Sequence, residues 1–450
     1  MIKKQNSMVA TNLVIIEELK SFLEMVCSQK DLRDIFVNSP TDFTRRRKLT
    51  LQRLVGMLIN LPKRSLSIEL QDFFDTLGMS SQSVTKGAFS LQRSKLHPCF
   101  FEVWNKLLVD CYYHYYADNV KRWRNFRVLA VDGSTAYLIH KPDIVEKFGT
   151  QDNQHTKIPM ARVMQLEDVL NKITIWGNIS PIKESEGSII SRQVEELYED
   201  SLTIFDRGYP SYLLMYLMLN QERKRNFIMR CKTDFNKQVK EFVASDEYSR
   251  IVMLTPTDQA ISKLKGYGYV LNSNTDIKVR MVKVLLKTGK VEILLTSLYD
   301  EQKYTLEDFK YLYGLRWNIE TTYGIQKNQQ QMEQFSGHRV ICIEQDYAAG
   351  IFVSNLQSLV EKQSGSYIKQ ISKSRKYNYK INKNVSWAYL KHNIIKLFLE
   401  EDSEKILKEM QRHFQRNIEP IRPGRQYERH RKTKRLKGKY QTLTNYKRAI

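Results

Sequence analysis

The segment YGLRWNIETTYGIQK carries a phenol, two cations and a carboxylate at spacings that suit one face of a helix. At about 100° per residue, Tyr313, Arg316, Glu320 and Lys327 fall within an arc of about 60°. We therefore expect a docked helix with a polar ridge, in which Glu320 stands between cations suited to phosphate. The alternative is a solvated face with Arg316 and Glu320 paired at i,i+4. The apolar residues of the expected buried side are Leu312, Leu315 and Ile319.

Two aspartates follow apolar runs elsewhere in the chain, Asp132 in RVLAVDGST and Asp206 in SLTIFDRGYP. We expect each to end a strand, and the carboxyl ends of strands in an open α/β sheet face the ligand crevice. Two neighbouring carboxylates repel unless a cation lies between them, and Mg²⁺ prefers oxygen ligands. The alternative is that each aspartate caps the turn that follows it.

Three carboxylates from separate segments suggest phosphodiester chemistry. Two divalent ions about 3.5–4 Å apart can activate a nucleophilic oxygen and stabilise charge on the leaving oxygen. We expect Asp132, Asp206 and Glu320 to hold two Mg²⁺ ions, with Mn²⁺ as a substitute. Cationic and phenolic side chains would then position a DNA strand without reading its sequence. Arg207, next to Asp206, would either reach a phosphate or pair with a structural acid.

The sequence predicts an α/β fold, because strand-like and helix-like segments alternate after about residue 127. A strand-rich stretch with alternating apolar residues interrupts this pattern between about 233 and 305. The expected strands are 127–132, 173–180, 201–205 and 226–232, and the expected helices are 191–200 and 212–219.

The N-terminal region reads as helical, with helix-period apolar residues in 51–61 and 66–77. Gly78 and the serines that follow it predict a turn and a new helix, which is the helix-turn-helix pattern. Its second helix would present Lys86 and Arg93 to DNA. The alternative is a helical bundle with a solvated basic face.

Composition favours a polyanionic partner. The chain of 450 residues has 72 Lys plus Arg against 49 Asp plus Glu, a net charge of +23. Nucleic acid is the commonest such partner, and an anionic membrane surface is the alternative. No apolar run is long enough to span a bilayer. The five cysteines form no Cys-x-x-Cys pair, which favours a reducing compartment.

We predict five segments from these patterns. They are a helical DNA-binding region (1–120), the first part of a catalytic core (121–232), a β-rich insertion (233–305), the second part of the core with the Glu-bearing helix (306–400) and a basic tail (401–450). The tail is poor in acids and aliphatics, which is typical of a nucleic-acid-binding or a merely solubilising extension.

At these residues the chain resembles the IS4-type DDE insertion-sequence transposases, over roughly residues 40 to 400. Asp132, Asp206 and Glu320 look like the family's acidic triad. The last segment matches its Y-(2)-R-(3)-E-(6)-K signature, and Trp317 after the arginine also fits.

The resemblance implies an RNase H-like core with a β-rich insertion, and cut-and-paste transposition through a hairpin intermediate. It implies that the acidic triad holds the metals and that Tyr313, Arg316 and Lys327 grip phosphates. Trp317 would stack on a displaced base or pack in the core. It also implies DNA ends and target DNA as partners, a homodimer in the synaptic complex, no membrane, and a prokaryotic cytoplasm near the nucleoid. The alternatives are a transposase-derived DNA-binding protein that does not cut and a nuclease on the same core. The intact triad argues against the first, and the hairpin-gripping residues argue against the second.

Overall fold

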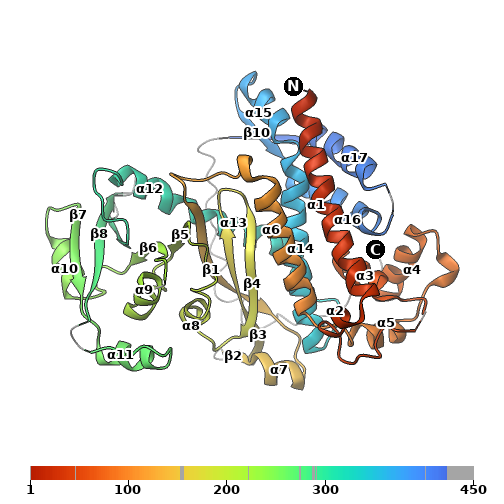
Figure 1. The fold of residues 1–450 in the computed structure, drawn as a ribbon, viewed down its shortest axis with the longest axis horizontal. Helices are drawn as coiled ribbons and strands as arrows, with labels where there is room; N and C mark the ends of the chain where they lie inside the picture. The colour runs from red at the N-terminus through yellow and green to blue at the C-terminus, as the bar shows by residue number, and fades with distance from the viewer. Residues whose placement is uncertain are drawn as a thin grey trace.

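A nine-stranded mixed sheet forms the centre of the molecule (Figure 1). The structure is a computed structural model that describes residues 2–45, 47–152, 157–220, 222–272, 275–285, 289, 291–400 and 402–422. The sheet order is β2-β3-β1-β5-β6-β9-β8-β7, and β4 pairs with the free side of β3. Its strands are β1 (Arg127–Tyr137), β2 (Thr150–Asp152), β3 (Lys157–Asp168), β4 (Ile173–Pro181), β5 (Ser201–Phe205), β6 (Asn226–Cys231), β7 (Ser249–Leu254), β8 (Ile277–Leu285) and β9 (Val291–Thr296).

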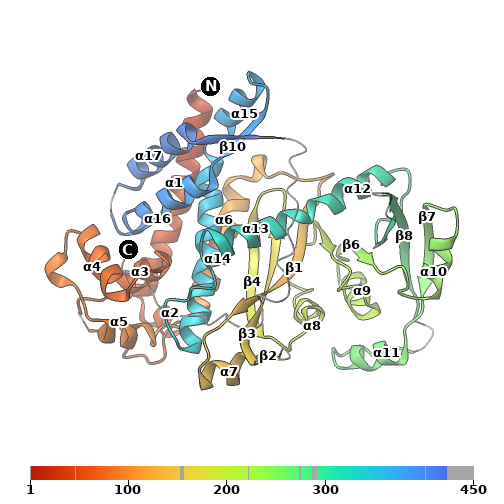
Figure 2. The ribbon, with the colours of Figure 1, turned by 180° about the vertical axis from the view of Figure 1, so that it is seen from behind.

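Helices cover both faces of this sheet, as the near-continuous apolar runs of β1 and β5 predict. On one face lie α8 (Glu186–Ser191), α9 (Tyr212–Leu219), α10 (Lys237–Ala244) and α11 (Asp258–Lys265). On the other lie α12 (Leu306–Leu315) and α13 (Trp317–Asn328), which follow one another along the sheet in Figure 2. A short helix, α7 (Pro142–Phe148), packs against the end of β3. The mixed α/β architecture expected from the sequence is thus confirmed.

The N-terminal and C-terminal helices share one hydrophobic core, which the sequence did not reveal. The long helix α14 runs beside α6 and connects this helical half to β4 (Figure 1). Trp104 of α6 stacks on Phe352 of α14 with ring centroids 4.1 Å apart. The helices of this half are α1 (Ile2–Ser28), α2 (Lys30–Asp34), α3 (Leu51–Ile59), α4 (Leu66–Thr76), α5 (Lys86–Arg93), α6 (Cys99–Tyr115), α14 (Val340–Lys362), α15 (Gly365–Lys373), α16 (Lys383–Leu399) and α17 (Ser403–Arg416).

The strand-rich stretch before the Glu-bearing helix continues the central sheet. Strand β9 pairs antiparallel with β6, and β8 pairs antiparallel with both β9 and β7. Part of the turn between β8 and β9 lies outside the described residues. The segment expected to be an insertion is therefore joined to the core by backbone hydrogen bonds.

The segment from 402 to 422 is folded, although the sequence suggested a tail beginning at 401. Helix α17 buries Leu407, Met410 and Phe414 against the helical core. The strand β11 (Ile418–Ile421) pairs antiparallel with β10 (Asn378–Ile381). The rest of the expected tail, 423–450, lies outside the described residues.

Two local predictions were wrong. The expected helix 191–200 is a series of turns, because the helix begins earlier, where the Ser185 side chain accepts from the Ser188 N–H. Strand β1 does not end at Asp132 but runs on to Tyr137, because its second half pairs with β3. No helix in the described part of the chain is both long and apolar enough to cross a bilayer.

Candidate active site

Strand register brings the two aspartates to one level of the sheet. Strands β1 and β5 are parallel, with Ala130 opposite Ile204. Asp132 and Asp206 each lie two residues further along, on chains that run about 4.8 Å apart in such a pair. The β1/β5 pairing ends at Ala130, so the side of Asp132 that faces β5 is open. Asp132 thus lies beyond the last paired residues of β1 and β5, even though β1 continues past it to Tyr137.

Strand alternation points both aspartates toward the same helices. Leu129 and Val131 contact α8 and α9 on one face, whereas Val128 and Ala130 face α12 and α13. Because side chains alternate along a strand, Asp132 also faces α12 and α13. The same count through Leu202 and Ile204 places Asp206 on that face.

The signature segment is two helices rather than one. Helix α12 begins with a capping box at Thr305 and Asp308, and α13 begins after Arg316. At this junction the Arg316 N–H bonds to the Tyr313 carbonyl at 3.2 Å. The Ile319 N–H bonds to the Arg316 carbonyl, also at 3.2 Å. These i→i+3 bonds tighten the helix locally, so the single-helix prediction was wrong.

Arg316 lies between two of the three carboxylates. Its Nη2 donates to Glu320 Oε1 at 2.7 Å, and its Nη1 lies 4.0 Å from Asp132 Oδ2. Only 4% of the residue is exposed. Burial alone would lower the pKa of Arg316, but Tyr313, Asp206 and Glu320 together raise it. The guanidinium is therefore held in its charged form by the surrounding acids.

Tyr313 and Arg230 contact the third carboxylate. The Tyr313 hydroxyl donates to Asp206 Oδ1 at 3.1 Å, and Arg230 Nη1 lies 3.7 Å from the same oxygen. Burial, followed by the charge of Asp206, raises the pKa of Tyr313. Arg230 also pairs with Glu292 at 3.0 Å. Sequence reasoning missed Arg230, because nothing in the run NFIMRC distinguishes it from a solvated strand residue.

The remaining residues singled out near the triad take different positions. Lys327 donates to the Thr135 carbonyl at 2.6 Å and lies 3.6 Å from Glu333.

Trp317 is 53% exposed with the Arg316 guanidinium 5.2 Å from its ring, so it is not a core residue. Arg207 is exposed. Of the expected buried side, Leu312 and Ile319 are fully buried and Leu315 is half-buried.

A fourth acid, Glu186, lies beside Asp132. Its Oε1 accepts from Arg162 at 2.5 Å and its Oε2 from the Tyr209 hydroxyl at 2.7 Å. A Cβ on Gly133 would stand 2.2 Å from the Glu186 carboxyl carbon, so any other residue there would push the Glu186 carboxylate aside. The Ser185 cap could have located helix α8, but no sequence pattern places Glu186 against Gly133.

The raised pKa of Asp132 reflects its burial and the negative charges around it. Burial raises its pKa from 3.8 to about 6; Arg316 lowers it, whereas Glu186 and Glu320 raise it further. Carboxylate oxygens are the donors that divalent cations such as Mg²⁺ prefer, so the donor chemistry fits. Among the described residues, no three His, Cys, Asp or Glu side chains stand close enough to hold a metal ion. As the side chains lie, the Arg316 guanidinium supplies the compensating charge.

The two cations expected on a DNA-docking helix have different surroundings in the structure. Lys86 is exposed at the start of α5. Arg93, at the end of α5, is 2% exposed and pairs with Asp346 of α14 at 2.7 Å. The Arg93 side chain therefore joins two helices inside the protein and is not exposed to contact DNA.

Comparison with known proteins gives the family. Residues 123–356 match the family described as Transposase DDE domain, whose members generally use divalent metals. The chain is 25% identical over 206 residues to Transposase InsG for insertion sequence element IS4 of Escherichia coli (strain K12). That match covers 45% of this chain and 44% of the relative, so it spans less than half of the relative's length. A cryo-EM structure of a piggyBac transposase synaptic complex with hairpin DNA is 13% identical, with a TM-score of 0.43 over 92% of this chain and 87% of that one. Because the family match covers more than half of the chain, the chain belongs to the Transposase DDE domain family.

Proposed function

We propose that this chain is a DNA transposase that cuts an insertion sequence at its ends and joins it to target DNA. One observation carries the proposal. Asp132, Asp206 and Glu320, from three separate segments, lie around Arg316 and Tyr313 at one edge of the sheet. A DNA-binding protein that does not cut has no need to place three acids against the strand it binds. The mixed sheet with its Glu-bearing helix also supports an RNase H-like core.

The three carboxylates would hold the divalent ions. We infer two Mg²⁺ ions, replaceable by Mn²⁺, which when bound would supply Lewis acidity at the phosphoryl oxygens. The protein's own residues do the rest. The gathered acids, including Glu186, disfavour a DNA phosphate unless positive charge accompanies it, which ties strand binding to ion binding.

The signature residues would position the cleaved strand. Arg316 offers a planar, permanently charged guanidinium that suits bidentate phosphate contacts. Burial and Asp206 keep Tyr313 protonated, so its hydroxyl can donate to a phosphate oxygen. Lys327 sits further along α13, where it can contact the next phosphate.

Trp317 has the exposure needed to stack on an unpaired base. That arrangement supports a hairpin intermediate, in which a base leaves the duplex at the bend. Joining two element ends in one complex requires two active sites, so we infer a homodimer on DNA.

An assay on DNA that carries the element's own ends tests this function. With Mg²⁺ we expect cleavage and a joined product. Cleavage without joining would indicate a nuclease on the same core, and a mobility shift without cleavage would indicate a binding protein only. The Glu320→Ala variant should bind the ends but leave them uncut. If the variant loses end binding as well, Glu320 has a structural rather than a catalytic role.

A further inference from the structure

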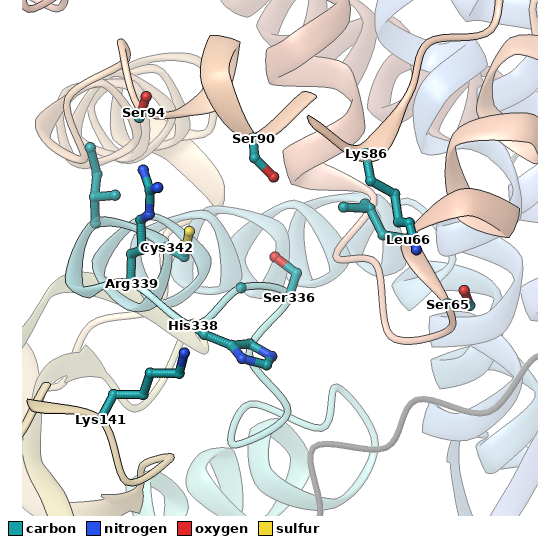
Figure 3. Close-up of a pocket in the computed structure, with 12 residues that line it drawn as sticks. Ser65, Leu66, Lys86, Ser90, Ser94, Lys141, Ser336, His338, Arg339 and Cys342 are labelled. Carbon is teal, nitrogen blue, oxygen red and sulfur yellow. The ribbon is translucent and has the colours of Figure 1, made fainter. Parts of the chain in front are cut away.

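A pocket of about 590 Å³ lies between the N-terminal helices and the core, and none of the residues of the acidic edge lines it. Figure 3 shows its walls. The starts of α4 and α5 form one side, with Lys86 and Ser90. Lys141, before α7, and the loop with His338 and Arg339, before α14, form the other. Segments more than 250 residues apart in the sequence thus meet around one cavity.

Positive charge dominates the pocket. Lys86, Lys141 and Arg339 are exposed, and no acidic residue lines the cavity in the described part of the chain. Arg339 also stands at the start of the 23-residue helix α14, where the helix dipole favours an anion. The hydroxyl of Ser90 adds a hydrogen-bond donor. Such a lining suits phosphate groups and gives nothing that would distinguish one base from another.

Hydrogen bonds from Arg93 hold the pocket loop, residues 336–342, in place. Arg93 donates to Ser336 Oγ and to the Cys342 carbonyl, on either side of Arg339. Gly337 lies so close to Cys342 that a Cβ on Gly337 would stand 2.5 Å from Cys342 Sγ. The loop is therefore tied to α5 on both sides of Arg339, which lines the cavity.

We propose that this pocket, through Lys86, Lys141 and Arg339, binds backbone phosphates of the duplex next to the cleaved bond. The proposal rests on the proposed function and extends it by assigning a second contact region. Lys141 follows Asp132 by nine residues, so the chain between them spans at most about 32 Å. Since phosphates repeat every 3.4 Å along a strand, the contacts should fall within about ten base pairs of the cut.

Salt dependence of DNA binding tests the proposal. The probe is a fluorescent duplex with the sequence of the element's end, bound to full-length protein at increasing salt. Each lost phosphate contact should lower the slope of log K against log salt by about 0.9. The Lys86→Ala/Lys141→Ala/Arg339→Ala variant should therefore lower the slope by about two to three.

The matched control removes three exposed cations elsewhere, Lys263, Lys265 and Lys405, each replaced by alanine. We expect its slope to stay close to that of the unaltered protein. An equal loss in both variants, or an unchanged slope in the pocket variant, overturns the proposal while leaving the proposed function intact. If the unaltered protein shows no salt-dependent binding of the duplex, both fail.

A second measurement uses the unaltered protein alone, so it does not depend on how the variants fold. Phosphates of the duplex are ethylated at random, and bound and unbound fractions are compared. We expect interference at a cluster of phosphates within about ten base pairs of the cut. Interference confined to the cleaved bond itself would count against the pocket.

Discussion

Arg93 and Arg316 are both buried arginines at helix ends, and each pairs with an acid from a distant segment, Asp346 and Asp132 respectively. Every side-chain nitrogen of Arg93 has a hydrogen-bond partner. Its Nε donates to Gln345 at 2.7 Å, and its other nitrogens reach Ser336, Cys342 and Asp346. Burial alone would raise the pKa of Asp346, but Arg93 holds that pKa below its usual value.

The hydrogen bonding of Arg316 is incomplete. Its Nε has no hydrogen-bond partner within the described residues, although it is buried. Its partners Asp132 and Glu320 keep 19% and 35% of their side chains exposed. The pKa of Asp132 stays raised, to about 6, despite the cation beside it. The groups around Arg93 are paired within the protein. The groups around Arg316 lack some of their hydrogen-bond partners, which is expected where a ligand completes the site.

The largest contrast should appear in stability. Arg93→Met leaves Asp346 buried without its partner, so we expect the free energy of unfolding to fall by about 3–5 kcal/mol. Arg316→Met removes a cation from acids that water already reaches, so we expect a change of about 1 kcal/mol or less. Urea denaturation of both variants measures this difference.

The double variant Arg93→Met/Asp346→Leu serves as the control. It removes both charges and should recover much of the stability lost by Arg93→Met. Equal destabilisation by Arg93→Met and Arg316→Met would end the distinction between the two clusters.

Cleavage should show the reverse order. Arg316→Met removes a charge that would face the transferred phosphate, so we expect single-turnover cleavage of end DNA to fall by about 10²–10³-fold. Binding of the same DNA should weaken by much less. Arg316→Lys, which keeps the charge but loses the planar fork, should recover only part of the rate. A full rate in Arg316→Met would make this residue structural.

Stability should depend on pH with opposite signs at the two clusters. The pKa of Asp132 is above its ordinary value, so its ionisation in the folded state costs stability as pH rises from about 4 to about 6. Without divalent ions, Asp132→Asn should therefore gain about 1–2 kcal/mol over the unaltered protein at pH 7 and nothing near pH 4.

Asp346 should behave the other way. Its pKa is lowered, so the stability it contributes is present at neutral pH and is lost as pH falls below its ordinary value of 3.8. Denaturation midpoints of Asp132→Asn and Asp346→Asn, measured from about pH 2 to pH 7, give both signs. The same slope for the two variants would contradict the assignment of the shifts.

The apolar runs before the two aspartates, together with the family resemblance, singled out the acids of this edge. The runs around Asp132 and Asp206 predicted buried strands, and counting alternate residues from Ala130 and Ile204 places both acids on one face. The parallel register that puts them level is a property of the β1/β5 pair, and neither strand specifies it alone. The break at Arg316 was hidden, because a tightened turn keeps helical backbone angles and needs no proline or glycine.

Long-range partners were beyond sequence reasoning. Arg93 and Lys86 lie on one short helix, and both looked like solvated cations of a DNA-docking surface. Only the packing of α5 on α14 buries Arg93 against Asp346 and leaves Lys86 at a pocket. Glu186 was missed for the same reason, since its contact with Gly133 joins segments 53 residues apart.

Metal preference of a cysteine variant tests the central claim most directly, namely that Asp132, Asp206 and Glu320 hold the divalent ions. In Asp206→Cys a softer sulfur replaces a hard oxygen ligand, so Mg²⁺ should no longer support cleavage, whereas Mn²⁺ should restore part of it. Arg207→Cys, one residue away and exposed, should cleave equally well with either ion. An Asp206→Cys variant that is active with Mg²⁺, or equally inactive with both ions while still binding DNA, would contradict the account.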